Sequence, residues 1–182
     1  MSIRTRSTLL FCALSALAAG GCATKIAASF SNGRPVFEPE KYFAHATRSW
    51  GILETGSGKP AEILHTKTSG HVIRDGLAFE QDLDFEHSKR SHRSWRLWRI
   101  DAHHYSATGT GIVGTARGEA YGNVFHLDFT LDAFPGNPLG HLHMSQWMYL
   151  QSDGVTMVNS DTLTKAGIVV ARITEQFKRA DR

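Results

Sequence analysis

Histidines are the residues of this 182-residue chain that most invite a chemical role, because ten are present. The best local pair is His141 and His143, since side chains two residues apart on a strand share one face. Leu142 and Met144 have the opposite parity and mark the buried face, so both histidines are expected on the outer one. No cysteine and no third ligand accompanies the pair. We therefore predict no metal site and no cofactor.

The carboxylates and serines also lack a catalytic arrangement. The four acids from Glu80 to Glu86 recur at every second residue, which is typical of the solvent-exposed face of one strand rather than of a paired glycosidase site. No Gly-x-Ser-x-Gly sequence marks a nucleophilic serine. We name no catalytic residue and favour a non-catalytic function, with an enzyme acting on lipid or envelope substrates as the least favoured alternative.

Cys22 has the surroundings of a lipid attachment site. Two arginines near the start, an apolar run from Leu9 to Ala19 and small residues precede it, as in a bacterial secretory signal that ends at an acylated cysteine. The other cysteine, Cys12, lies within the signal. We predict that residues 1–21 are removed and that Cys22 is acylated, anchoring the protein in the cell envelope. The following residue, Ala23, favours the outer membrane, and an ordinary signal cleaved near Ala23 is the alternative.

Removal of the signal leaves a nearly neutral chain of one domain. The mature chain would hold 18 Lys+Arg against 17 Asp+Glu, a formal net charge of +1, so nucleic acid is not an expected partner. Residues 22–36 are rich in Ser, Asn, Gly and Pro, which predicts a tether to the membrane. Residues 37–182 are long enough for a single domain with one core.

Most of the domain alternates apolar and polar residues, the pattern of strands with one buried face. The clearest cases are 77–85, 123–131 and 142–150. Turn residues separate the strands, and no long amphipathic helix interrupts them. We predict an all-β fold, an antiparallel lipocalin-like (calycin-type) barrel of about eight to ten strands, with a sandwich as the alternative. The other candidate strands are 42–54, 61–73, 93–101, 104–110, 154–159 and 167–178.

The segment 109–122 is unusual because it contains five glycines. A phosphate-binding loop would need a helix after it and a Lys-Ser/Thr pair, and both are missing. Glycines at bulges and tight barrel corners explain the segment better.

The inward-facing set of the predicted barrel suits a small apolar or amphipathic ligand. Aromatic and methionine side chains would line the interior, and a few amides share their parity. The alternative is a ligand-free core, in which case the protein would serve a structural or interaction role. The candidate binding residues are Phe79, Gln81, Asn123, Phe125, Phe129, Met144, Gln146 and Met148.

A basic segment, 89–99, carries five Lys or Arg residues and no acid. Held near a membrane by an acyl chain, Lys89, Arg90 and Arg93 could add attraction to anionic headgroups. Two tryptophans are interleaved, and alternation sends them to opposite faces. The alternative is a solvated hairpin whose arginines cover the rim of the barrel.

The order of several short motifs resembles the proteobacterial lipoprotein family catalogued as domain of unknown function 3833. This resemblance implies a lipocalin-like domain behind a lipoprotein signal, and it implies no particular activity. Gly111 replaces an acid expected from the family pattern, and Ser145-Gln146 replaces an acidic pair. The matching motifs are Phe37-Glu38-Pro39, Tyr42-Phe43, Trp50-Gly51, Arg93-Ser94-Trp95, Val113-Gly114-Thr115-Ala116-Arg117-Gly118, Gly122-Asn123, Trp147-Met148-Tyr149 and Lys165-Ala166-Gly167.

Overall fold

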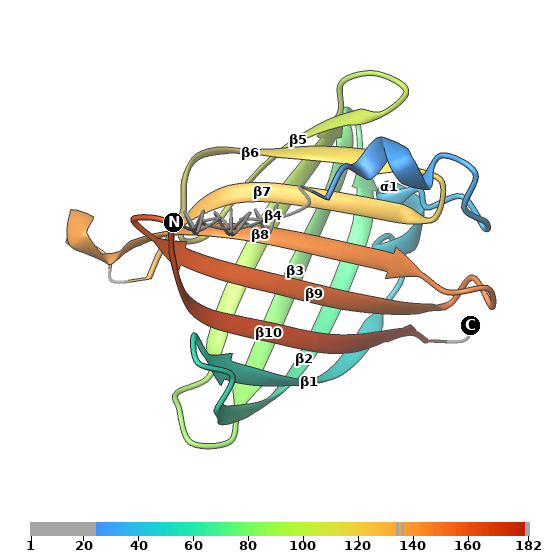
Figure 1. Ribbon diagram of the computed structural model, residues 1–182. Helices are drawn as coiled ribbons and strands as arrows, with labels where there is room; N and C mark the ends of the chain where they lie inside the picture. The colour runs from blue at the N-terminus through green and yellow to red at the C-terminus, as the bar shows by residue number, and fades with distance from the viewer. Residues whose placement is uncertain (1–24, 134, 136, 181–182) are drawn as a thin grey trace, which may run out of the picture.

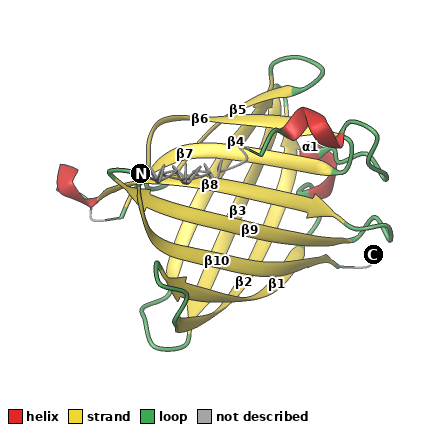
Figure 2. Cartoon of the chain, viewed as in Figure 1, coloured by secondary structure: helices red, strands yellow, loops and turns green. Residues whose placement is uncertain are grey.

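Ten antiparallel strands close into one barrel in the computed structural model, which describes residues 25–133, 135 and 137–180 (Figures 1 and 2). Each strand pairs with the next along the chain, and the first pairs with the last to close the barrel. The predicted all-β barrel is therefore confirmed, and the sandwich is excluded. The strands are β1 (Thr47–Thr55), β2 (Pro60–Ile73), β3 (Gly76–Phe85), β4 (Ser91–Arg99), β5 (His104–Gly109), β6 (Ile112–Tyr121), β7 (Val124–Asp132), β8 (His141–Leu150), β9 (Thr156–Lys165) and β10 (Ile168–Arg179).

The strand that sequence patterning missed is β6, which lies within the glycine-rich segment. Its pairing with β7 shifts register between Val113 and Arg117. Gly114 lies at this bulge with a φ of 72°, a conformation that favours glycine. The glycines interrupt the apolar alternation without ending the strand, so the bulge interpretation is confirmed and the strand count rises to ten.

The inward register matches the predicted one. Phe125 is 2% exposed, and Phe129, Met144 and Met148 are each 4% exposed. The β7–β8 register pairs Phe125 with Met148 and Phe129 with Met144, so these side chains stack along one inner wall. A one-residue slip would have turned all of them toward solvent.

The segment before β1 closes one end of the barrel. The short helix α1 (Pro39–Tyr42) begins with a proline, whose fixed φ and missing N–H suit the first helical position. Phe37, Tyr42 and Phe43 are buried in the same core cluster as the inner wall. Tyr42 Oη donates to the carbonyl of Val155 over 3.0 Å, which fastens this plug to the β8–β9 loop.

The described part of the predicted tether lies against the outside of the barrel. The 3-10 helix η1 (Ala27–Phe30) buries Ala27 against Val124 and Trp147. Lys25 lies over the Trp147 ring, 4.5 Å from its centroid. The segment packs against the barrel instead of extending away from it, because Ala27 and Phe30 give it an apolar face that is buried there.

The predicted signal 1–21 and Cys22 lie outside the described residues. Within the described part of the chain, no helix is both long and apolar enough to cross a membrane. A third short helical segment, η2 (Pro138–Gly140), precedes β8.

Candidate functional site

A cavity of about 200 Å³ occupies the barrel interior. All but one of the predicted binding residues line it, so the sequence placed this wall correctly. The exception is Asn123, whose side-chain amide donates to the carbonyl of Leu150 over 3.0 Å at the plugged end. Asn123 lies in the β6–β7 turn, directly after Gly122, and its side chain bonds to Leu150 rather than lining the cavity. The predicted residues that line the cavity are Phe79, Gln81, Phe125, Phe129, Met144, Gln146 and Met148.

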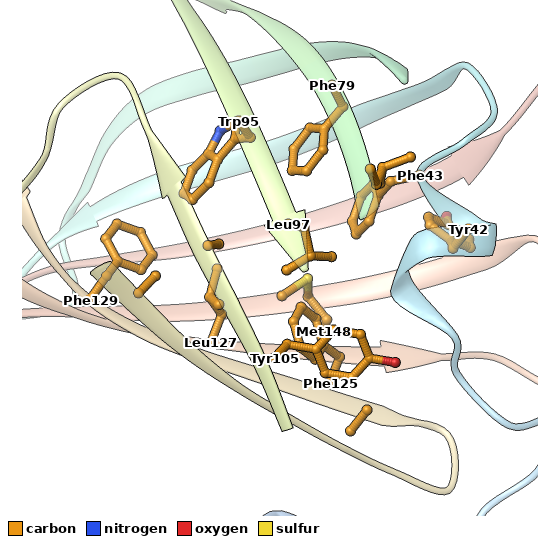
Figure 3. Packing of buried hydrophobic residues seen from close by; sticks show 14 of the residues in the cluster. Tyr42, Phe43, Phe79, Trp95, Leu97, Tyr105, Phe125, Leu127, Phe129 and Met148 are labelled. Atoms are coloured by element: carbon orange, nitrogen blue, oxygen red, sulfur yellow. The ribbon is translucent and has the colours of Figure 1, made fainter. Parts of the chain in front are cut away.

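An aromatic column leads from the plug into this cavity (Figure 3). Phe43 stacks on Phe79 with ring centroids 5.3 Å apart, and Phe79 stacks on Trp95 at 5.8 Å. Trp95 then meets Phe129 edge-on at 5.5 Å. Offset and edge-on pairs are favourable arrangements for aromatic rings. These four rings therefore form a well-packed apolar part of the interior wall.

Polar side chains also line the interior. They come from β8, β9, β10, β1, β2, β3 and β4, which follow one another around the barrel, and several of these strands also contribute apolar side chains to the cavity. We call this set the polar arc, and it adds hydrogen-bonding groups to the apolar lining. Its members are Gln146, Asp161, Asn159, Glu175, Ser49, Thr66, Thr68, Gln81 and Arg93.

Glu175 is held at the centre of the polar arc. Ser49 Oγ donates to Glu175 Oε1 over 2.6 Å, and Thr66 Oγ1 donates to the same oxygen over 2.9 Å. Burial raises the pKa of Glu175 above its ordinary value, and hydrogen bonds from Ser49, Thr66 and Asn159 oppose that rise. Gly51 lies opposite Glu175 on β1, and a Cβ there would lie 2.3 Å from Glu175 Cγ. Only glycine leaves room for this carboxyl side chain.

Asp161 is the second buried carboxyl, 2% exposed. Its Oδ2 accepts from Asn159 Nδ2 over 2.9 Å and from Gln146 Nε2 over 3.5 Å. Burial raises the pKa of Asp161 well above its ordinary value, and the neighbouring Glu175 charge adds to this, while the hydrogen bonds and Arg93 oppose it. Because Oδ2 accepts both amides, a proton on this carboxyl would sit on Oδ1, which would then be a donor.

Two buried oxygens of this region have no hydrogen-bond partner in the described structure. They are Asp161 Oδ1 and Asn159 Oδ1, and both residues line the cavity. Buried polar atoms are nearly always paired, so unpaired ones on a cavity wall indicate a place for a polar group of a bound molecule. Trp95 Nε1, from the aromatic column, is a third unpaired buried atom.

Arg93 corrects the predicted membrane-facing patch. It lines the cavity, because it shares the inward parity of Trp95 and pairs in register with Gln81. Burial lowers the pKa of Arg93, and the charges of Asp161 and Glu175 oppose that effect. Because its guanidinium points into the barrel, Arg93 cannot contact a membrane. The predicted patch is therefore reduced to Lys89 and Arg90.

The two other members of that patch are on the outside. Arg90 makes a two-point ion pair with Asp84, with its Nε 2.9 Å and its Nη2 3.0 Å from the carboxylate oxygens. Lys89 is exposed beside it. The acids of β3 neutralise this surface further, since His92 Nδ1 lies 2.8 Å from Asp82 Oδ1.

One outer-face cluster resembles a hydrolase triad in composition only. Ser145 Oγ lies 2.9 Å from His126 Nε2, and Asp128 Oδ2 lies 3.9 Å from the same nitrogen. A serine triad needs the carboxylate on the other ring nitrogen, so this cluster does not have the required geometry. Across the described residues, no group of three or more His, Cys, Asp and Glu side chains is arranged to hold a metal ion.

Sequence reasoning missed Asp161, Asn159 and Glu175 as site residues. The predicted strand 154–159 stopped short because Ser160, Asp161 and Thr162 are all polar, and alternation disappears there. A signal did exist: Met157, Asn159, Asp161 and Leu163 share one parity, so polar residues are enclosed between inward apolar ones.

Comparison with known proteins gives a family and a fold. Residues 16–179 match the model of the family described as "Protein of unknown function (DUF3833)". No curated protein has significant sequence similarity to the chain. Among solved structures, the S-type phycobiliprotein lyase CPES from Guillardia theta superposes with a TM-score of 0.61 and 10% identity, over 84% of this chain and 98% of that one. At that identity the likeness shows the barrel fold alone.

Proposed function

The chain belongs to the family of unknown function DUF3833, and from the interior of its barrel we propose that it is a non-catalytic binding protein for a small amphipathic ligand. The observation that carries this proposal is the cavity of about 200 Å³, whose lining is mostly apolar with a few polar groups. An apolar cavity of about 150 Å³ suffices to bind benzene. A ligand slightly larger than a single ring therefore fits, whereas a long acyl chain would require the cavity to enlarge.

The chemistry of the wall supports binding over catalysis. The aromatic column supplies apolar contact, and the polar arc supplies hydrogen-bonding groups. Such a lining, mostly apolar with a few convergent polar groups, is typical of ligand pockets. The buried carboxyls are held by hydroxyl and amide donors, as groups that position a ligand would be.

We further propose that the protein is an envelope lipoprotein, acylated at Cys22 and facing the periplasm from the outer membrane. The charged start and apolar run before Cys22 support this. The packing of η1 adds a geometric consequence. Lys25 is three residues after Cys22, a distance of at most about 11 Å along the chain, so the anchor would hold the Trp147 wall near the membrane.

Two variants test the binding proposal. Ala107 lines the cavity and is 1% exposed, so Ala107→Phe would fill the cavity, whereas Ala61→Phe adds the same ring to an exposed position of β2. Titration with 1-octanol, followed by amide chemical shifts, should move interior resonances in the wild type and in Ala61→Phe. The shifts should be lost in Ala107→Phe. If the wild type binds no octanol, the binding proposal fails, and the alternative of a structural protein with a filled core is favoured.

A further inference from the structure

The most unusual charge in the molecule is the guanidinium of Arg93. It projects from β4 into the cavity between Gln81 and Trp95, its neighbours in register and along the strand. In the described structure, no carboxylate oxygen lies within 4.0 Å of it and no acceptor is in hydrogen-bonding geometry. Arginine stays charged in proteins, and charges removed from water are normally paired. The Arg93 side chain is half-buried, so its guanidinium presents donors to the cavity that no protein acceptor in the described structure takes.

The two interior carboxyls do not fill that place. Glu175 Oε1 accepts from Ser49 and Thr66, and Asp161 Oδ2 accepts from Asn159. The bonds from Ser49 and Thr66 hold Glu175 toward β1 and β2, and those from Asn159 and Gln146 hold Asp161 on the β8–β9 side of the barrel. Burial also favours their neutral forms, which leaves Arg93 as the interior cation without an anion.

We propose that Arg93 anchors the carboxylate of a medium-chain apolar acid whose tail lies against the aromatic column. A guanidinium binds a carboxylate through two parallel hydrogen bonds, which no neutral head group can copy. The tail would contact the apolar side chains of Phe129, Met144 and Met148, which line the cavity. Scaling from benzene in about 150 Å³, a cavity of about 200 Å³ holds roughly eight carbons. This inference rests on the proposed binding function and names its ligand class.

The charges facing Arg93 predict a pH dependence. Asp161 and Glu175 are the charged groups that act on it across the cavity. As the pH rises toward the raised pKa values of these acids, they become anions that compete with the ligand. Octanoate affinity should therefore fall as the pH rises through the raised pKa values of these two acids, although the ligand stays ionised. Glu175→Gln should reduce that fall.

The test compares octanoate with 1-octanol, which has the same chain and no charge, by isothermal titration of the purified protein. Arg93→Gln should weaken octanoate binding at least about tenfold, because a charge-assisted hydrogen bond is lost. It should weaken octanol binding far less, because the alcohol carries no charge, and a thermal melt of the variant shows that it is folded. Arg96→Gln, on the exposed face of the same strand, should change neither.

The outcomes separate the two claims. If octanol binds and Arg93→Gln does not lower octanoate affinity, the anchor role is overturned while the binding function survives. If neither ligand binds the wild type, both claims fail. Preference for octanoate that is lost only in Arg93→Gln supports the anchor.

Discussion

Gly51→Ala should destabilise the protein through a direct clash with the buried carboxyl of Glu175. A Cβ at Gly51 would lie 2.3 Å from Glu175 Cγ and 2.5 Å from the carbonyl oxygen of Thr174, where ordinary contacts begin at 3.4 Å. The two strands must therefore separate by about 1 Å or the carboxyl must leave its hydroxyl donors. Overpacking of this kind costs about 1–3 kcal/mol. For a domain of this size, that corresponds to a Tm lower by roughly 2–12 °C.

A double-mutant cycle shows whether Glu175 is the cause. Glu175→Ala removes Cγ, so Gly51→Ala should cost less in that background, with a coupling of about 0.5–3 kcal/mol. Part of the cost should remain, since Thr174 is unaffected. Urea unfolding of the four proteins measures the coupling. Equal costs in both backgrounds would refute the placement of the Glu175 side chain over Gly51.

The remaining predictions concern the second carboxyl and the plug. The free energy of unfolding of the Asp161→Asn variant should increase relative to that of the wild type as the pH is raised from 4 to 8. The folded Asp161 keeps its proton above the pH at which the unfolded chain releases it, so wild-type stability falls across that range. Urea unfolding at pH 4, 6 and 8 checks this, and a difference that does not vary with pH would contradict it. Phe43→Ala should cost about 3–5 kcal/mol, because the ring is 6% exposed and stacks on Phe79. The matched change His45→Ala, on a less buried residue of the same segment, should cost far less in the same thermal melt.

The sequence predicted the barrel because most strands bury one face only. Alternation then fixes both the strand and its register, as at Phe125 and Phe129. It could not predict β6, because glycines at the bulge remove the side chains that carry the pattern.

Most of the polar arc was missed for a different reason. Gln81 and Gln146 were predicted because they share the parity of apolar neighbours, whereas Asp161 and Glu175, which are ionisable, looked like solvent-facing residues. Arg93 was assigned outward because it lies in a basic run, whereas Trp95, two residues on, indicates the opposite. Only the closed barrel shows that these residues, far apart along the chain, meet around one cavity.

Native mass spectrometry of the protein purified from its native cells tests the central claim most directly. The barrel should carry a small bound molecule, released on denaturation as an acid of roughly eight carbons. The same preparation of Ala107→Phe should lack it, because the added ring occupies the cavity. A wild-type protein that is free of any bound molecule, with a spectrum matching that of Ala107→Phe, would contradict the account.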